Sequence, residues 1–371
     1  MPRMFRIAYR LVVRSLLAGF GAAAFALRPP AADRIPVKVI VLSGFEVGED
    51  TGDVPGEFQF WYEREKLFDR MELPGASHPL CRNTEGLYGD VGATTANAQL
   101  SPVTTSELVM AICLDPRFDL RKTYWLVNGI AGIDPASGPI GSAVWSENVV
   151  DGDAMREIDE AEIPSGWPYG LFAIGTDSPG KLPMYAEHPG GWNGAKLEYS
   201  MVYPLNRRLA NWAYEVSKAV ELPDSPRLKA WREKYTGYPL AQLPPRVMIG
   251  DTLGSARYWH GPRRTQWARD WVRLWTSGTG TFSTTSMEQQ DYAGTLTRMA
   301  AKGLLDINRV MVLRTASNYC MPPPGQGVET TIGDESMGTD AALEAAYRTG
   351  SSVVHELLRN WTKYENSTPG G

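Results

Sequence analysis

Two short polar segments in the last third of the chain could do chemistry together. Met287 and Glu288 stand before a helix-like pattern, and Ser317 and Asn318 follow a short apolar run at residues 310–313. Such a run is typical of a buried strand. Open α/β sheets bind ligands at the carboxyl ends of their strands, so both segments are expected at one edge of a sheet.

The first of these segments needs a helix to position it. Thr285 or Ser286 can cap a helix that ends near Gly303, and Glu288 would stabilise the positive end of the helix dipole. The apolar face of this helix is marked by side chains at three-to-four spacing: Tyr292, Leu296 and Met299.

Three further apolar runs predict buried strands that end in candidate site residues. Residues 37–42 lead to Glu46, and residues 246–249 lead to Asp251, with Tyr258 and Trp259 close behind as rings that could stack on a base. The third run, residues 124–127, leads into a small-residue segment that we predict to be a backbone turn: Gly129, Ile130, Ala131 and Gly132.

Helical patterns occur in several other parts of the chain. The predicted helices cover residues 57–68, 205–220, 227–235, 263–275 and 341–363. Asn206 is the expected cap of the second of them. Strands alternating with helices predict an α/β fold.

The chemical residues resemble those of the nucleoside phosphorylase and nucleosidase superfamily. In that superfamily a Met-Glu pair before a helix holds the ribose, and a strand ending in Arg-x-x-Ser-Asp or Ser-Asn places an Asp or Asn beside the purine. The matching residues here are Met287, Glu288, Arg314, Ser317 and Asn318.

A closer resemblance covers most of the chain. Residues 44–52, 56–61, 114–120 and 125–134 look like the purine nucleoside permease family, whose sequence pattern is that of a nucleosidase. The resemblance implies a three-layer sandwich with a central mixed β-sheet flanked by helices. It also implies one nucleoside phosphorylase-like domain at residues 36–363.

The resemblance further implies a role for each candidate residue. Met287 and Glu288 would bind the ribose, and Glu46 would activate the attacking water, although Glu49, Asp50 and Asp53 compete for that role. Asn318 would act on the leaving purine. Base-binding positions are implied for Asp251, Tyr258, Trp259 and Ser317.

The segment around Ile130 bears on the choice of nucleophile. The superfamily usually carries a hydroxyl residue at this turn, and the hydroxyl helps to hold a phosphate or a water molecule. Ile130 has no hydroxyl, which favours hydrolysis over phosphorolysis, or binding without chemistry. We expect no bound cofactor, and phosphate is retained only as a candidate co-substrate.

Composition limits the classes of partner. A net charge of -5 gives no reason to expect nucleic acid, and 43% hydrophobic residues among 371 can form a sizeable core. Three cysteines and four histidines are scattered without metal-binding spacing, so no metal is predicted and one disulfide is left open. Relatives of this fold often assemble as dimers, trimers or hexamers, so a homo-oligomer is expected by analogy.

The two ends of the chain have sequence patterns that differ from that of a folded domain. Residues 1–30 combine arginines with a short apolar stretch and an Ala-x-Ala site, which is typical of a secretory signal peptide. We therefore expect an exported protein, periplasmic or secreted, with no membrane span in the mature chain. Residues 364–371 are predicted to be a disordered tail.

Two functions from different classes follow from the same pocket. The first is an exported enzyme that cleaves the N-glycosidic bond of purine nucleosides. The second is a nucleoside-binding protein that assists uptake without catalysis. They differ in whether Glu46 and Asn318 take part in chemistry or only in binding.

Overall fold

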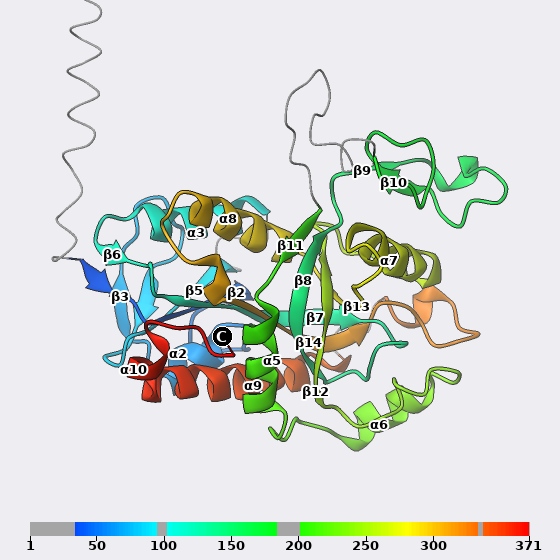
Figure 1. The fold of residues 1–371 in the computed structure, drawn as a ribbon. Coiled ribbons are helices and arrows are strands. Elements are labelled where there is room, and N and C mark those ends of the chain that lie inside the picture. Colours follow the sequence, from blue (N-terminus) through cyan, green and yellow to red (C-terminus); the bar gives the residue numbers. More distant parts are fainter. Residues whose placement is uncertain (1–33, 95–101, 184–200, 333–336, 371) are drawn as a thin grey trace, which may run out of the picture.

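A computed structural model describes residues 34–94, 102–183, 201–332 and 337–370 (Figure 1). The predicted signal peptide lies outside these residues. The strands are β1 (Ile35–Pro36), β2 (Val39–Glu46), β3 (Asp69–Met71), β4 (Leu80–Arg82), β5 (Leu87–Thr94), β6 (Phe118–Asp119), β7 (Tyr124–Ile133), β8 (Ala143–Asp151), β9 (Met155–Glu157), β10 (Leu171–Ala173), β11 (Val202–Pro204), β12 (Val247–Gly254), β13 (Phe282–Ser286) and β14 (Val310–Tyr319).

Helices connect and cover these strands. The α-helices are α2 (Gln59–Arg64), α3 (Pro102–Leu114), α5 (Arg207–Ser217), α6 (Pro226–Glu233), α7 (Pro262–Trp275), α8 (Gln289–Ala301), α9 (Thr339–Arg359) and α10 (Trp361–Tyr364), and the 3₁₀ turns are η2 (Glu160–Glu162), η4 (Ile307–Arg309) and η5 (Val328–Thr330). Asn206 caps α5 as predicted, because its side-chain oxygen accepts hydrogen bonds from two backbone amides of the first turn.

The centre of the sheet is parallel and buried. Strand β2 pairs in parallel with β5 on one side and with β7 on the other, and β7 pairs in parallel with β14. These strands are continuous apolar runs because helices cover both of their faces. Their carboxyl ends therefore lie at a common edge.

Five strands close into a ring. Strand β8 pairs with β12, β12 with β13, β13 with β7, β7 with β14, and β14 again with β8. The mixed α/β character agrees with the sequence prediction. The expected three-layer sandwich around a central sheet is not confirmed, because this part of the sheet closes on itself.

Two apolar clusters pack helices against opposite faces of the sheet. Helices α2, α5 and α9 contribute to one cluster, through side chains such as Trp61 and Val353. Helices α3 and α8 contribute to the other, through side chains such as Val109 and Leu296. In Figure 1, α9 runs below the strands, whereas α3 and α8 lie above them.

One predicted turn is a strand in the structure: Gly129, Ile130, Ala131 and Gly132 lie inside β7. The strand expected at residues 246–249 also runs further, so that Asp251 lies inside β12. The reason is pairing across the ring: β7 extends to Ile133 because it contacts both β14 and β13 beyond the apolar run. The prediction of a turn at residues 129–132 is therefore wrong.

Other differences concern the ends of elements. Thr285 and Ser286 belong to β13, so α8 begins at Gln289 without the predicted side-chain cap. The segment predicted as a tail contacts the domain through its first residues. Arg309 donates hydrogen bonds to the carbonyl oxygens of Tyr364 and Glu365, and Tyr124 Oη donates to the carbonyl of Ser367.

Neither a disulfide nor a membrane-spanning helix is found among the described residues. All three cysteines are buried and unpaired, so the disulfide left open by the sequence is not formed. Among the residues described, none of the helices combines the length and the apolar character that crossing a bilayer requires.

Candidate functional site

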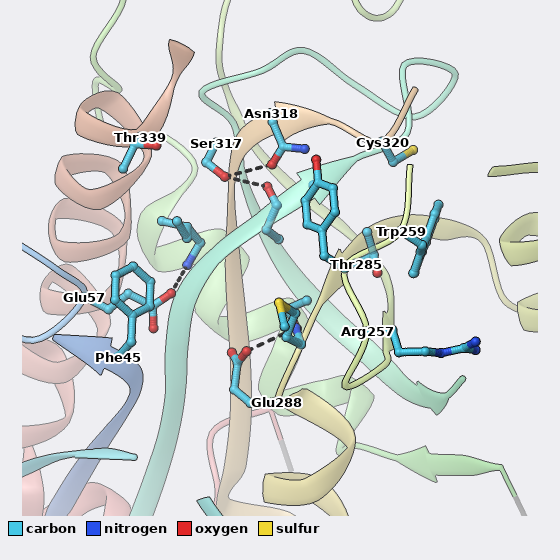
Figure 2. Close-up of a pocket in the computed structure, with 16 residues that line it drawn as sticks. Phe45, Glu57, Arg257, Trp259, Thr285, Glu288, Ser317, Asn318, Cys320 and Thr339 are labelled. Atoms are coloured by element: carbon cyan, nitrogen blue, oxygen red, sulfur yellow. Dashed lines mark hydrogen bonds between the residues drawn. The ribbon is translucent and has the colours of Figure 1, made fainter. Parts of the chain in front are cut away.

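A cavity of about 370 Å³ lies where the carboxyl ends of β2, β7 and β14 meet the start of α8. Figure 2 shows Glu57 beside Phe45 at one side, Glu288 at the lower end, and Ser317 and Asn318 at the upper end. Its lining combines apolar, aromatic and polar side chains: Phe45, Glu57, Ile130, Ala131, Gly132, Arg257, Tyr258, Trp259, Thr285, Ser286, Met287, Glu288, Ser317, Asn318, Cys320 and Thr339.

Two buried carboxylates share one buried guanidinium at the wall of the cavity. Arg314 Nη1 lies 2.6 Å from Glu288 Oε1 and 3.9 Å from Glu57 Oε1. The Arg314 side chain is fully buried, and the two glutamates are almost so. Buried charges are tolerated only when paired, so each member of this triad requires the others.

Backbone amides fix the carboxylate of Glu57. Its Oε2 accepts a hydrogen bond from the Gly44 amide at 2.6 Å, and its Oε1 accepts one from the Ile130 amide at 2.6 Å. Burial raises the pKa of Glu57 to about 8, the Glu288 charge acts in the same direction, and Arg314 opposes them. Glu57 can therefore accept or hold a proton near neutral pH.

Two glycines make room for the triad. A Cβ atom at Gly129 would collide with Arg314 Nη1 and with both carboxylate oxygens of Glu57. At Gly44, a Cβ atom would lie 3.0 Å from Glu57 Oε2 and from the Glu288 carboxylate. These strands can approach the charges closely only because neither position carries a side chain.

Met287 and Glu288 lie where sequence analysis expects them, between β13 and α8. Both line the cavity, and Glu288 Oε2 accepts a hydrogen bond from the Met287 amide at 3.1 Å. The thioether of Met287 provides an apolar contact beside a charged group. This combination suits a sugar ring, which has apolar faces and hydroxyl groups around its rim.

Ser317 and Asn318 form the opposite end of the cavity. The pairing of β14 with β7 shifts register between Ala316 and Asn318, which is a local bulge. Ser317 Oγ donates to Asn318 Oδ1 at 3.1 Å, and Asn318 Nδ2 donates to the Tyr319 carbonyl at 3.0 Å. A carboxamide nitrogen has two protons, so Asn318 keeps one donor for a ligand.

The segment between β12 and α7 supplies the aromatic wall. Tyr258 and Trp259 both line the cavity, and Tyr258 is 42% exposed. Trp259 is held by ring contacts with Trp267, at 5.7 Å between centroids, and with Phe282, at 6.1 Å. Trp259 is thus a fixed ring, whereas Tyr258 is partly open to solvent.

Three predicted site residues do not line the cavity: Gly129, Asp251 and Glu46. Asp251 is buried in β12, where its carboxylate accepts hydrogen bonds from Asn148 Nδ2 and from the Thr281 amide. These two hydrogen bonds join β12 to the neighbouring parts of the sheet. The structure therefore gives no geometric support to a base-binding Asp251.

Glu46 also lies outside the cavity, contrary to expectation. Its carboxylate accepts hydrogen bonds from the backbone amides of Val47, Gly56, Phe58 and Gln59. Both oxygens are therefore engaged, and Glu46 closes the loop at residues 47–56 onto the start of α2. The carboxylate that reaches the cavity is Glu57, which sequence reasoning missed.

One cluster of potential metal ligands occurs among the described residues. Single ligand atoms of Asp50, His78 and Cys81 all lie within 4.8 Å of one another. However, the ring nitrogens of His78 lie 2.7 Å from Asp90 Oδ1 and 2.9 Å from Asp50 Oδ1. Arg70 takes the second oxygen of Asp50, so the cluster satisfies its own charges without an ion.

Known proteins share the sequence pattern of this chain. The family model described as purine nucleoside permease matches residues 36–369. The chain belongs to this family. The match spans the cavity and every element that lines it.

Two curated relatives bear the same family name. A purine nucleoside permease of Candida albicans is 27% identical over 341 residues, which cover 89% of this chain and 77% of that protein. A probable purine nucleoside permease of Schizosaccharomyces pombe is 29% identical over 263 residues, covering 68% of this chain and 72% of that protein.

Solved structures show the same fold in another class of protein. The 5′-methylthioadenosine/S-adenosylhomocysteine nucleosidase of Colwellia psychrerythraea 34H, solved in complex with adenine, matches with a TM-score of 0.50 and 13% identity. The match covers 86% of this chain and 96% of that chain. This member of the purine nucleoside permease family thus has a nucleosidase-like fold.

The first prediction concerns Glu46. Replacing it by glutamine should lower the free energy of unfolding by about 1–3 kcal/mol, because the NH2 group that takes the place of one carboxylate oxygen cannot accept hydrogen bonds from the buried backbone amides. Urea unfolding followed by tryptophan fluorescence measures the change. An unchanged midpoint would show that Glu46 does not hold the 47–56 loop.

The second prediction concerns Gly129. Its replacement by alanine should destabilise the fold by about 1–3 kcal/mol through overpacking, since the added methyl group meets Glu57 and Arg314. Gly132→Ala in the same strand is the matched control, because its nearest contact would be a looser 3.2 Å to a Thr285 methyl group. Equal midpoints in urea for the two variants would contradict the expected crowding.

Proposed function

We propose that this protein cleaves the N-glycosidic bond of purine nucleosides by hydrolysis. The observation that carries the proposal is the buried triad of Glu57, Arg314 and Glu288 at one wall of a cavity whose far end offers Asn318. This arrangement would provide a proton acceptor, a sugar-binding carboxylate and a base-binding amide within one cavity.

The charges suit the transition state of glycosidic bond cleavage. Positive charge develops on the sugar ring as the bond breaks, as in other glycoside hydrolyses. Glu288 would bind the ribose hydroxyls, and Met287 would contact the sugar through its apolar side chain. The two carboxylates are already held in place, so they can stabilise the developing cation without rearranging.

Glu57 takes the role that the sequence assigns to Glu46. Its carboxylate lies at the cavity wall, and the buried environment raises its pKa to about 8. When deprotonated, it would orient a water molecule and accept a proton from it as the water attacks the sugar.

Asn318 and the aromatic wall would hold the base. The free N–H of the Asn318 carboxamide can donate to a ring nitrogen or carbonyl oxygen of the purine, with Ser317 orienting the amide. The ring of Trp259 or Tyr258 would stack on the base, which contributes about 1–3 kcal/mol in nucleic-acid sites.

The electrostatics favour water over phosphate as the nucleophile. Among the described residues that line the cavity, Arg257 supplies the one cationic side chain, and its guanidinium is paired with Glu157. The buried Arg314 is already committed to Glu288 and to the Ile130 carbonyl. When Glu57 is deprotonated, a phosphate dianion would therefore face two carboxylates without a free cation to bind it.

A second candidate function is nucleoside binding that assists uptake. It is favoured by the names of the curated relatives, which are permeases. Binding requires Glu288, Met287, Asn318 and the aromatic wall, but it does not require a proton acceptor at Glu57. The two functions are therefore separated by the effect of changing Glu57 alone.

The decisive experiment incubates the purified protein with inosine, adenosine and guanosine, with and without phosphate, and separates the products by chromatography. We expect free base and ribose without phosphate. Glu57→Gln should lower kcat by about 10²–10⁴-fold because the proton acceptor is lost, and Glu288→Ala should raise KM as well. Glu344→Gln, a change on the outer face of α9, is the control.

Each other outcome has a defined meaning. Ribose 1-phosphate formed only with phosphate would establish phosphorolysis instead of hydrolysis. Nucleoside binding by calorimetry without release of base, lost in Glu288→Ala and retained in Glu57→Gln, would establish the uptake function. Neither binding nor cleavage of any of the three nucleosides would refute both.

The pH dependence provides an independent prediction. A general base is active when deprotonated, so kcat/KM, which reports groups of the free enzyme, should rise with pH and level off above about 8, the pKa of Glu57. Initial rates between pH 5 and 9.5 on one buffer series measure the profile. A rate that is already constant from pH 5 would show that Glu57 is not the base.

A further inference from the structure

A second group of buried charges lies behind the loop that carries Glu57. The imidazole of His78 is held between Asp90, at 2.7 Å from Nδ1, and Asp50, at 2.9 Å from Nε2. The three side chains are nearly inaccessible to solvent, with exposures of 7% for His78, 0% for Asp90 and 6% for Asp50. The proposed mechanism does not use any of them.

The charges of this group balance when the imidazole holds two protons. Both neighbours of the ring are carboxylates, and each can only accept a hydrogen bond while it is ionised. Arg70, on β3, lies 2.6 Å from the second oxygen of Asp50. Burial acts to lower the pKa of His78, but its hydrogen bonds to Asp50 and Asp90 outweigh this effect and raise it to about 9. Two cations therefore face two anions.

The group joins three separate parts of the chain. Asp50 belongs to the 47–56 loop between β2 and α2, His78 to the connection between β3 and β4, and Asp90 to β5, which pairs with β2. The contact between Asp50 and His78 thus ties the middle of the 47–56 loop to the sheet. At its base the same loop is closed by the carboxylate of Glu46.

The loop leads directly into the cavity. Glu57 is its next residue, and Phe58 follows with its ring edge-on to the imidazole of His78, at 5.8 Å between centroids. The Glu57 amide donates to the Phe45 carbonyl at 2.9 Å. Displacement of His78 would therefore disturb both the loop and the aromatic ring beside Glu57.

We infer that His78 is a positioning residue: bridging Asp50 and Asp90, it holds the 47–56 loop so that the Glu57 carboxylate stays against the Gly44 and Ile130 amides. The inference rests on the proposed role of Glu57 in hydrolysis. His78 does not line the cavity and acts only through the loop.

The alternative for the same cluster is a metal site made by Asp50, His78 and Cys81. The direct hydrogen bond between His78 and Asp50 favours a clamp, meaning the bridge that His78 forms between Asp50 and Asp90. This bond already joins the two atoms that an ion would have to separate. The Cys81 thiol also favours the clamp over a metal site. Burial raises its pKa, so without an ion it stays protonated. A metal site is therefore an outcome that the test must be able to detect.

The experiment compares His78→Gln with the double variant His78→Gln/Asp90→Asn. The single variant removes the buried cation and turns a carbonyl oxygen toward Asp90, leaving a net negative charge. The double variant replaces that carboxylate by an amide that can donate to the new carbonyl, so the cluster is neutral again. Cys81→Ala is the control, because the clamp does not use the thiol.

We expect His78→Gln to lower kcat by about 10–100-fold with KM within about twofold, because misplacement of a reacting group affects the chemical step. The double variant should recover most of kcat, and Cys81→Ala should match the wild type. Hydrogen exchange of the Ile130 amide, which binds Glu57, should be faster in His78→Gln and return to normal in the double variant.

Hydrogen exchange separates failure of this inference from failure of the proposed function. If the wild-type protein releases no base, faster exchange at Ile130 in His78→Gln, reversed in the double variant, still supports the clamp. Unchanged kcat and unchanged exchange in a folded His78→Gln protein would overturn it. If His78→Gln does not fold, Asp50→Asn, which keeps an acceptor for the imidazole, should give a weaker change in the same direction.

Metal binding is tested on the same proteins. Equilibrium dialysis of the wild type against Zn²⁺ is expected to show no tightly bound ion at this cluster. One Zn²⁺ bound per chain, lost in Cys81→Ala together with kcat, would replace the clamp by a metal site.

Discussion

The structure depends on keeping two carboxylates and one guanidinium out of water at the same place. Glu57, Glu288 and Arg314 come from a loop, a helix start and a strand that are far apart in the sequence. Isolated buried charges are strongly unfavourable, so these three elements must meet before any of the charges is compensated. The glycines of β2 and β7 are the residues that allow this meeting.

The grouping of these three side chains also sets the charge of the cavity wall. One guanidinium faces two carboxylates, so the wall carries net negative charge once Glu57 is deprotonated, above its pKa of about 8. A developing cation is attracted to such a wall and an anion is repelled by it. This is the charge that the proposed cleavage, with its cationic sugar, would require.

The sequence predicts those parts of the site that depend on local pattern. The Met287–Glu288 and Ser317–Asn318 pairs lie at one cavity because each follows or precedes a recognisable element, and strand ends meet at a sheet edge. Glu57 could not be chosen over Glu46 by pattern, since the path of the 47–56 loop decides which carboxylate reaches the cavity. Its only sequence signal is its position just before the aromatic start of α2. The ring of strands was missed for a similar reason, because β8 and β14 pair across a long separation in the chain.

Strand β14 carries both ends of the cavity on one continuous backbone. Arg314, which lies against Glu288 and Glu57, and Ser317, at the opposite end, are three residues apart, or about 10 Å along a strand. Strand β14 pairs with β8 over residues 313–315 and with β7 on both sides of the bulge at Ser317, so the sheet holds this spacing. The strand therefore fixes the distance between the two ends of the cavity, and with it the length of a ligand that can contact both ends at once.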